Sequence, residues 1–120
     1  MLNYQTLLSI TEEFYAKAKI DILIGYHFRI IEDFETHIPK IADFWNLQLN
    51  GSLENRAHLP FHLFQTHKPL MLKQGEIDRW VKLFSDTLDE NINKKTITNE
   101  QRNLWLTKIK FFKSKIESFI

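Results

Sequence analysis

The amino-acid sequence predicts an all-α fold, and three observations support this prediction. Apolar residues recur at intervals of three and four along most of the chain, as on the buried face of a helix. No stretch of the sequence sustains the alternation of apolar and polar residues that is typical of a half-buried strand. The 120 residues include only 3 Gly and 3 Pro, so few positions favour a turn.

The first helix is expected to begin near Ser9. Ser9 and Glu12 have the spacing of a capping box, in which two side chains satisfy backbone N–H groups at a helix start. Tyr15 lies at the edge of the apolar face of this helix, and residues 21–28 are expected to contain its end and a turn at Gly25. The buried positions of the helix are Ile10, Phe14 and Ala18.

A second helix is predicted from Glu35 or Thr36 to Leu49, with the Asn50–Gly51 pair as its stop. Pro39 would then lie in the first turn, where its missing N–H costs little, whereas an earlier start would place a kink there. Four residues at i, i+4, i+7 and i+8 share the buried face of this helix. They are His37, Ile41, Phe44 and Trp45.

Residues 52–60 are expected to form a loop, and residues 61–66 a short helix that leads to His67. A third helix is predicted from about Glu76 to Asn91, with apolar residues on two faces. One face holds Ile77, Val81, Phe84 and Leu88, and the other holds Trp80, Leu83 and Thr87. The last helix follows a capping box at Thr98 and Gln101. Its inward positions are Trp105, Ile109, Phe112, Ile116 and Phe119.

Composition excludes several classes of function. The chain has no cysteine, so disulfides, thiolate metal sites and cysteine nucleophiles are ruled out. A net charge of +1 gives no electrostatic footprint for nucleic acid. The sequence shows neither a signal peptide nor an apolar run of about 18 residues that could span a membrane. We therefore expect one domain, residues 1–120, in the cytoplasm, without a nucleic-acid or membrane partner.

Four lysines accompany the apolar stripe of the last helix, at positions 108, 110, 113 and 115. Such a pattern is compatible with a helix that binds a membrane surface or a partner. The modest net charge and the nearby Glu100 and Glu117 favour the simpler interpretation, the solvated back of a core helix.

Aromatic residues and histidines follow one another in an order that suggests a flat apolar cofactor, such as haem, held between helices. Phenylalanine-rich helices can equally pack an ordinary core. Taken singly, each position also fits a plain role as a core aromatic or a surface histidine. The positions are Tyr15, Phe28, His37, Ile41, Phe44, Trp45, His67, Leu70 and Trp80.

His67 is the candidate iron ligand. A haem iron needs a neutral imidazole on one side, and His67 lies on a short segment that Pro69 makes rigid. Three apolar residues that follow, at positions 70–72, can contact the edge of a porphyrin. His62 competes for the same role. His58 and His62 have the spacing of a helical metal pair, but Pro60 between them disrupts such a helix.

Two side chains are candidate hydrogen-bond donors to a ligand on the iron. Bound dioxygen carries partial negative charge, which the Tyr15 hydroxyl or the Trp80 indole N–H can stabilise. A hydrogen bond to a charged group contributes roughly 1.5–3 kcal/mol, so one donor slows ligand release by about tenfold to a hundredfold.

Over residues 10–92 the chain resembles the group III truncated haemoglobins of bacteria. The absence of a Gly-Gly pair also fits group III, because groups I and II typically carry such pairs at helix junctions. The segments that carry the resemblance are Phe14-Tyr15, His37 with Asp43-Phe44-Trp45, and His67 followed by Arg79–Phe84 and by Glu90-Asn91. The fold implied is a two-over-two helical sandwich, which is a shortened globin.

The resemblance also implies a role for each matching residue. His67 is similar to the proximal ligand of haem b, and Tyr15 and Trp80 to the distal donors. His37 is similar to the distal-helix histidine, which acts as a gate. The implied haem-contacting residues are Phe28, His37, Ile41, Phe44, Trp45, His67, Leu70 and Trp80.

The resulting expectation is a haem protein that binds dioxygen and other diatomic ligands at a five-coordinate iron. Slow release of the ligand favours redox chemistry or scavenging over transport. The expected reactions are with nitric oxide or peroxide, and a reductase is a possible electron donor. One alternative is a small peroxidase-like enzyme, although no Asp or Glu lies within five residues of His67 to orient it. The other is a cofactor-free helical interaction module, which would be colourless.

Overall fold

The computed structural model describes residues 2–31, 33–51 and 71–118. All regular structure in these residues is α-helical. The helices are α1 (Tyr4–Ile20), α2 (Gly25–Arg29), α3 (Phe34–Asn50), α5 (Gln74–Asn93) and α6 (Asn99–Glu117). The loop expected at 52–60, the short helix expected at 61–66, and Phe119 lie outside the described residues. None of the helices among these residues is long and apolar enough to cross a membrane.

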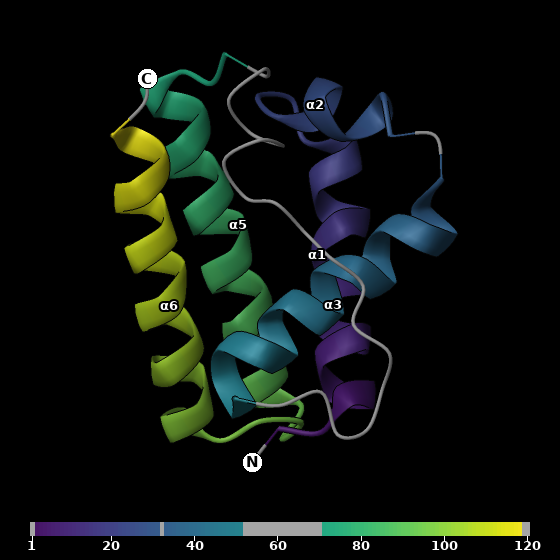
Figure 1. Ribbon diagram of the computed structural model, residues 1–120, viewed down its shortest axis with the longest axis vertical. Coiled ribbons are helices and arrows are strands. Elements are labelled where there is room, and N and C mark those ends of the chain that lie inside the picture. The colour runs from purple at the N-terminus through teal and green to yellow at the C-terminus, as the bar shows by residue number, and fades with distance from the viewer. Residues whose placement is uncertain (1, 32, 52–70, 119–120) are drawn as a thin grey trace.

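The helices pack as two pairs, α1 with α3 and α5 with α6 (Figure 1). Helices α5 and α6 run antiparallel beside each other, while α3 crosses α1 at a steep angle. Further contacts between α1 and α5, and between α3 and α6, join the two pairs. The prediction of an all-α, two-over-two helical sandwich is therefore confirmed.

Helix α1 begins earlier than the sequence pattern suggested. The side chain of Asn3 accepts a hydrogen bond from the backbone N–H of Thr6 at 2.8 Å and so caps the helix. Leu7 is fully buried, so the additional turn contributes to the core. The prediction of a start near Ser9 was wrong, because Ser9 lies inside the helix.

Asp21 ends α1 and shapes the turn that leads to α2. One of its carboxylate oxygens accepts the backbone N–H groups of Leu23 and Ile24 at 3.0 and 3.1 Å. The other accepts two N–H groups of Arg79 on α5 at 2.7 and 2.9 Å. These hydrogen bonds fix the corner between α1 and α2 against α5.

Gly25 is the first residue of α2, so the turn expected at Gly25 lies instead at residues 22–24. A Cβ atom at this position would lie 2.9 Å from the carbonyl oxygen of Lys19 and 3.2 Å from that of Ala18. Glycine therefore allows the backbone of α2 to approach the end of α1 closely.

Helix α3 has the predicted stop but a slightly earlier start. Gly51 adopts a φ of 76° at the C-terminal end, which is the left-handed conformation expected there. Asp33 caps the other end by accepting the N–H of Thr36 at 3.2 Å, so the helix begins at Phe34. Pro39 is consequently in the second turn rather than the first, and the carbonyl of Glu35 receives no helical N–H from it.

Helices α5 and α6 match their predictions within two or three residues. Thr98 and Gln101 form the expected capping box, with hydrogen bonds of 2.9 and 3.1 Å. The inward positions of α6 that are described are buried: Trp105, Ile109, Phe112 and Ile116. Lys110 and Lys115 are exposed, as on a solvated helix face, while Lys113 pairs with Glu117 at 3.0 Å and with Asp78 of α5 at 3.4 Å.

An aromatic cluster forms the centre of the core. The Trp105 side chain is fully buried, and its ring centroid lies 5.4 Å from that of Phe84 and 5.9 Å from that of Trp45. These three residues come from α6, α5 and α3, so the cluster joins the two helix pairs.

Replacing Trp105 with alanine should lower the free energy of unfolding by about 3–5 kcal/mol, because a large cavity would remain among rigid rings. Urea unfolding of the two proteins measures the difference. Leu104→Ala is the matched control, since Leu104 is the neighbouring residue and is 46% exposed. Equal losses in the two variants would contradict the central place of Trp105.

Candidate functional site

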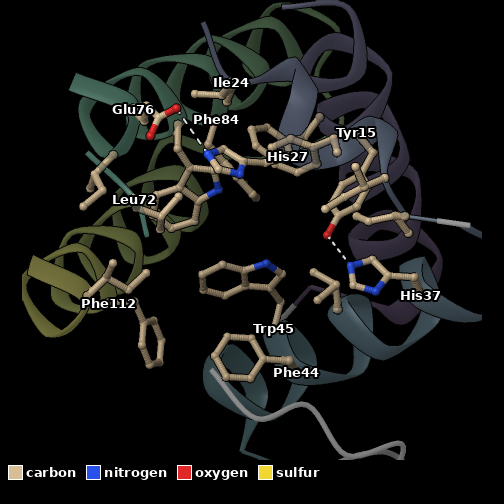
Figure 2. A pocket seen from close by; sticks show the side chains of 18 residues that line it. Tyr15, Ile24, His27, His37, Phe44, Trp45, Leu72, Glu76, Phe84 and Phe112 are labelled. Atoms are coloured by element: carbon tan, nitrogen blue, oxygen red, sulfur yellow. Dashed lines mark hydrogen bonds and ion pairs between the residues drawn. The ribbon is translucent and has the colours of Figure 1, made fainter. Parts of the chain in front are cut away.

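A cavity of about 290 Å³ lies between the two helix pairs (Figure 2). This volume is close to the lower end of ligand-binding pockets, which is roughly 300 Å³. The lining side chains are mostly aromatic or aliphatic. They are Phe14, Tyr15, Ile24, His27, Phe28, Ile30, Ile31, His37, Ile41, Phe44, Trp45, Leu72, Glu76, Ile77, Trp80, Phe84, Phe112 and Ile116.

The structure gathers nearly all of the predicted site residues around this one cavity. They come from α1, α2, α3 and α5, and the sequence separates them by up to 65 positions. Those that line it are Tyr15, Phe28, His37, Ile41, Phe44, Trp45 and Trp80. The expected ligand His67, its competitor His62, His58 and Leu70 lie outside the described residues.

Tyr15 and His37 meet at one side of the cavity (Figure 2). The Tyr15 hydroxyl and Nε2 of His37 form a hydrogen bond of 2.9 Å. Tyr15 is buried, and this burial raises the pKa of its phenol, so the group keeps its proton. The phenol can therefore donate to Nε2 or to a ligand in the cavity.

Aromatic rings hold Tyr15 in place. Its ring contacts Phe14 at 5.8 Å and Phe28 at 5.3 Å between centroids, both edge to face. Elsewhere on the cavity wall, Phe44 packs against Trp45 and Phe112, in each case at 5.1 Å between centroids. Such ring packing, edge to face in all of these pairs except the tilted Phe44–Phe112 pair, restricts the orientation of each ring and gives the cavity rigid walls.

A second polar group on the cavity wall was not identified from the sequence. Glu76, which is 5% exposed, lies beside His27 (Figure 2). One oxygen of its carboxylate accepts the backbone N–H of Lys73 at 2.9 Å. The other accepts the Tyr26 hydroxyl and lies 3.2 Å from Nε2 of His27.

The carboxylate of Glu76 remains charged despite its burial. Burial by itself raises the pKa of this group, but the hydrogen bonds from Tyr26 and Lys73, together with His27, outweigh it. The net effect is a pKa below the usual value for glutamate. The cavity therefore has an anionic carboxylate in contact with an imidazole.

The sequence contains a pattern that indicates a buried role for Glu76. Glu76, Trp80 and Phe84 are spaced four residues apart, so a carboxylate shares the inward face of α5 with two large aromatic rings. A carboxylate on an apolar helix face needs a partner. In the described part of the chain, no group of three or more His, Asp or Glu side chains is arranged to hold a metal ion.

Comparison with known proteins supports the fold. Neither the models of protein families nor the curated proteins gave a match to this sequence. Among solved structures, a group III truncated hemoglobin from Campylobacter jejuni superimposes with a TM-score of 0.77. The two chains are 22% identical, and the match covers 98% of this chain and 91% of that one. The resemblance inferred from the sequence is thus confirmed as a likeness in fold.

Proposed function

We propose that this chain, which has the fold of a group III truncated haemoglobin, binds haem b in the aromatic cavity and takes dioxygen or other diatomic ligands there. The observation that carries the proposal is the hydrogen bond between Tyr15 and His37. It places a protonated phenol inside a cavity whose walls are otherwise mostly apolar. Such a donor suits a ligand that is small and partly negative.

The chemistry of the lining fits haem. The porphyrin is flat and apolar, and it packs well against aromatic side chains such as Phe28, Phe44 and Trp45, all of which line the cavity. When bound, haem supplies an iron that binds diatomic ligands and exchanges electrons. The residues of the chain exclude water and provide the hydrogen-bond donors.

We assign the iron ligand to His67, which the resemblance to the truncated haemoglobins implies. The two imidazoles that line the cavity in the described residues each have Nε2 in a hydrogen bond. Nε2 of His37 bonds to the Tyr15 hydroxyl, and Nε2 of His27 bonds to Glu76. These contacts support an iron ligand from another part of the chain.

Hydrogen-bond donors inside a mostly apolar cavity favour chemistry over transport. A ligand held by Tyr15, with Trp80 as a second donor, would leave slowly, which suits reaction with nitric oxide or peroxide. Each of these reactions needs electrons, so a reductase is the expected partner. A peroxidase-like role has one observation in its favour, a carboxylate–imidazole pair in the cavity, although that pair contains His27 and not His67.

Titration of the purified protein with haem tests the proposal. We expect an intense Soret band that saturates at one haem per chain, because one cavity binds one porphyrin. Phe112→Arg is a useful comparison, since it places a charge in the cavity wall and should weaken binding. A colourless protein after haem addition would contradict the proposal and favour the cofactor-free interaction module.

A further inference from the structure

We propose that His27, oriented by Glu76, is the proton acceptor for ligands that enter the cavity as neutral acids, such as hydrogen peroxide or hydrogen cyanide. This inference rests on the proposed haem binding and adds a catalytic residue to it. The juxtaposition that carries it is a buried imidazole on the cavity wall, backed by a buried carboxylate whose oxygens are all held by hydrogen bonds.

The position of His27 is suitable for this role. Its side chain is 10% exposed and lines the cavity, and Figure 2 shows its ring between Glu76 and the open centre of the cavity. The ring also stacks on Tyr26, with centroids 4.0 Å apart. The imidazole is therefore held in one place, in contact with the space that a ligand would occupy.

The hydrogen-bond partner of His27 fixes its tautomer. An ionised carboxylate only accepts hydrogen bonds, so the Nε2 atom that faces Glu76 carries the proton. The neutral ring then keeps its basic lone pair at Nδ1. When Nδ1 takes up a proton, the positive charge of the ring is balanced by the carboxylate 3.2 Å away.

Hydrogen bonds to Glu76 hold the carboxylate beside His27. The backbone N–H of Lys73 and the Tyr26 hydroxyl hold the carboxylate, while the Asp21–Arg79 ion pair fixes the neighbouring corner of the fold. Glu76 is 5% exposed whereas Tyr26 is 47% exposed, so the carboxylate is shielded from solvent although the phenol that donates to it is not.

The apolar cavity creates the need for a base. An anion loses its hydration on entering such a space, whereas the neutral acid HX enters at little cost. Binding as an anion then requires the H–X bond to break. The electron pair stays with X, and the proton forms an N–H bond at Nδ1 of His27, so charge and atoms balance.

The other polar pair of the cavity is less suited to accept this proton. Tyr15 is a protonated phenol whose pKa is raised by burial, so it acts as a donor. If Tyr15 donates to Nε2 of His37, the lone pair of that nitrogen is already engaged. The two sides of the cavity thus have different functions, donation at Tyr15 and proton acceptance at His27.

Rapid mixing of haem-loaded variants with two ligands tests the inference. Hydrogen cyanide must lose a proton to bind ferric protein, while carbon monoxide binds ferrous protein without proton transfer. In His27→Phe, association of hydrogen cyanide should fall by at least about tenfold, since a positioned base contributes roughly 10²–10⁴-fold. Association of carbon monoxide should be unchanged. A variant that had lost its structure would bind carbon monoxide at an altered rate as well.

Glu76→Gln should also lower the association rate of hydrogen cyanide, because an amide cannot balance the charge of a positive imidazole. Glu100→Gln is the matched control, since Glu100 is exposed on α6 and should have no effect. His27→Gln, which can still contact Glu76, replaces His27→Phe if the latter does not fold.

Two results would overturn the inference. One is an unchanged hydrogen cyanide rate in the His27 variants, and the other is an equal fall for both ligands. Neither result affects the proposed function, which fails if the unaltered protein takes up no haem or if its haem does not bind dioxygen.

Discussion

The His67→Ala variant is expected to lose tight haem retention. A globin-type iron is held by one imidazole, and removal of this ligand leaves only the contacts of the porphyrin with the cavity walls. The remaining imidazoles of the described cavity do not replace it readily, because the Tyr15 and Glu76 contacts hold their Nε2 atoms. The measurement is the rate at which a haem acceptor removes haem from each protein.

His62→Ala is the matched control for this experiment. His62 lies five residues before His67 and is the competing ligand in the sequence. The His62→Ala variant should retain haem as the unaltered protein does. If His62→Ala loses haem and His67→Ala keeps it, the iron ligand must be reassigned to His62.

Replacing both predicted donors, Tyr15→Phe with Trp80→Phe, should accelerate dioxygen release. Each donor hydrogen bond to a partly charged ligand contributes roughly 1.5–3 kcal/mol, so the loss of one donor alone raises the rate about tenfold to a hundredfold. Tyr15 should account for most of the effect, because it is buried and its phenol keeps its proton. Stopped-flow displacement of dioxygen by carbon monoxide measures the rate.

Tyr4→Phe is the control for the loss of a tyrosine hydroxyl from the same helix. Tyr4 begins α1 and is not among the residues that line the cavity. Its variant should release dioxygen at the unaltered rate. An unchanged rate in the double variant would mean that neither Tyr15 nor Trp80 reaches the ligand.

The helices of the fold were predictable because their signals are local. The capping box at Thr98 and Gln101, and the glycine stop at Gly51, each depend on residues within one turn. Ser9 misled the prediction because its pattern recurs inside a helix, and only the burial of Leu7 in the core shows that the helix extends further. Local sequence alone could not choose between Asn3 and Ser9 as the cap.

The functional site was predictable where its residues share a helix face. His37, Ile41, Phe44 and Trp45 repeat at helical spacing, and all four line the cavity. The hydrogen bond between Tyr15 and His37 joins residues 22 positions apart, so the pattern could suggest both residues but not their contact. The role of His67 comes from the resemblance to a family and stays a prediction.

The Glu76–His27 pair was missed for a physical reason. Its members are 49 residues apart, and a glutamate in the first turn of a helix is usually explained by the helix dipole alone. Only the three-dimensional structure, in which His27 of α2 contacts Glu76 of α5, reveals that the carboxylate is buried and has an imidazole as its partner.

The most direct test of the central claim is the absorption spectrum of the haem-loaded ferrous protein, recorded without dioxygen and again after dioxygen is added. The proposed function predicts a five-coordinate spectrum first, and then a stable dioxygen complex that dissociates slowly. A six-coordinate ferrous spectrum that dioxygen does not change, or the absence of any haem band, would contradict it.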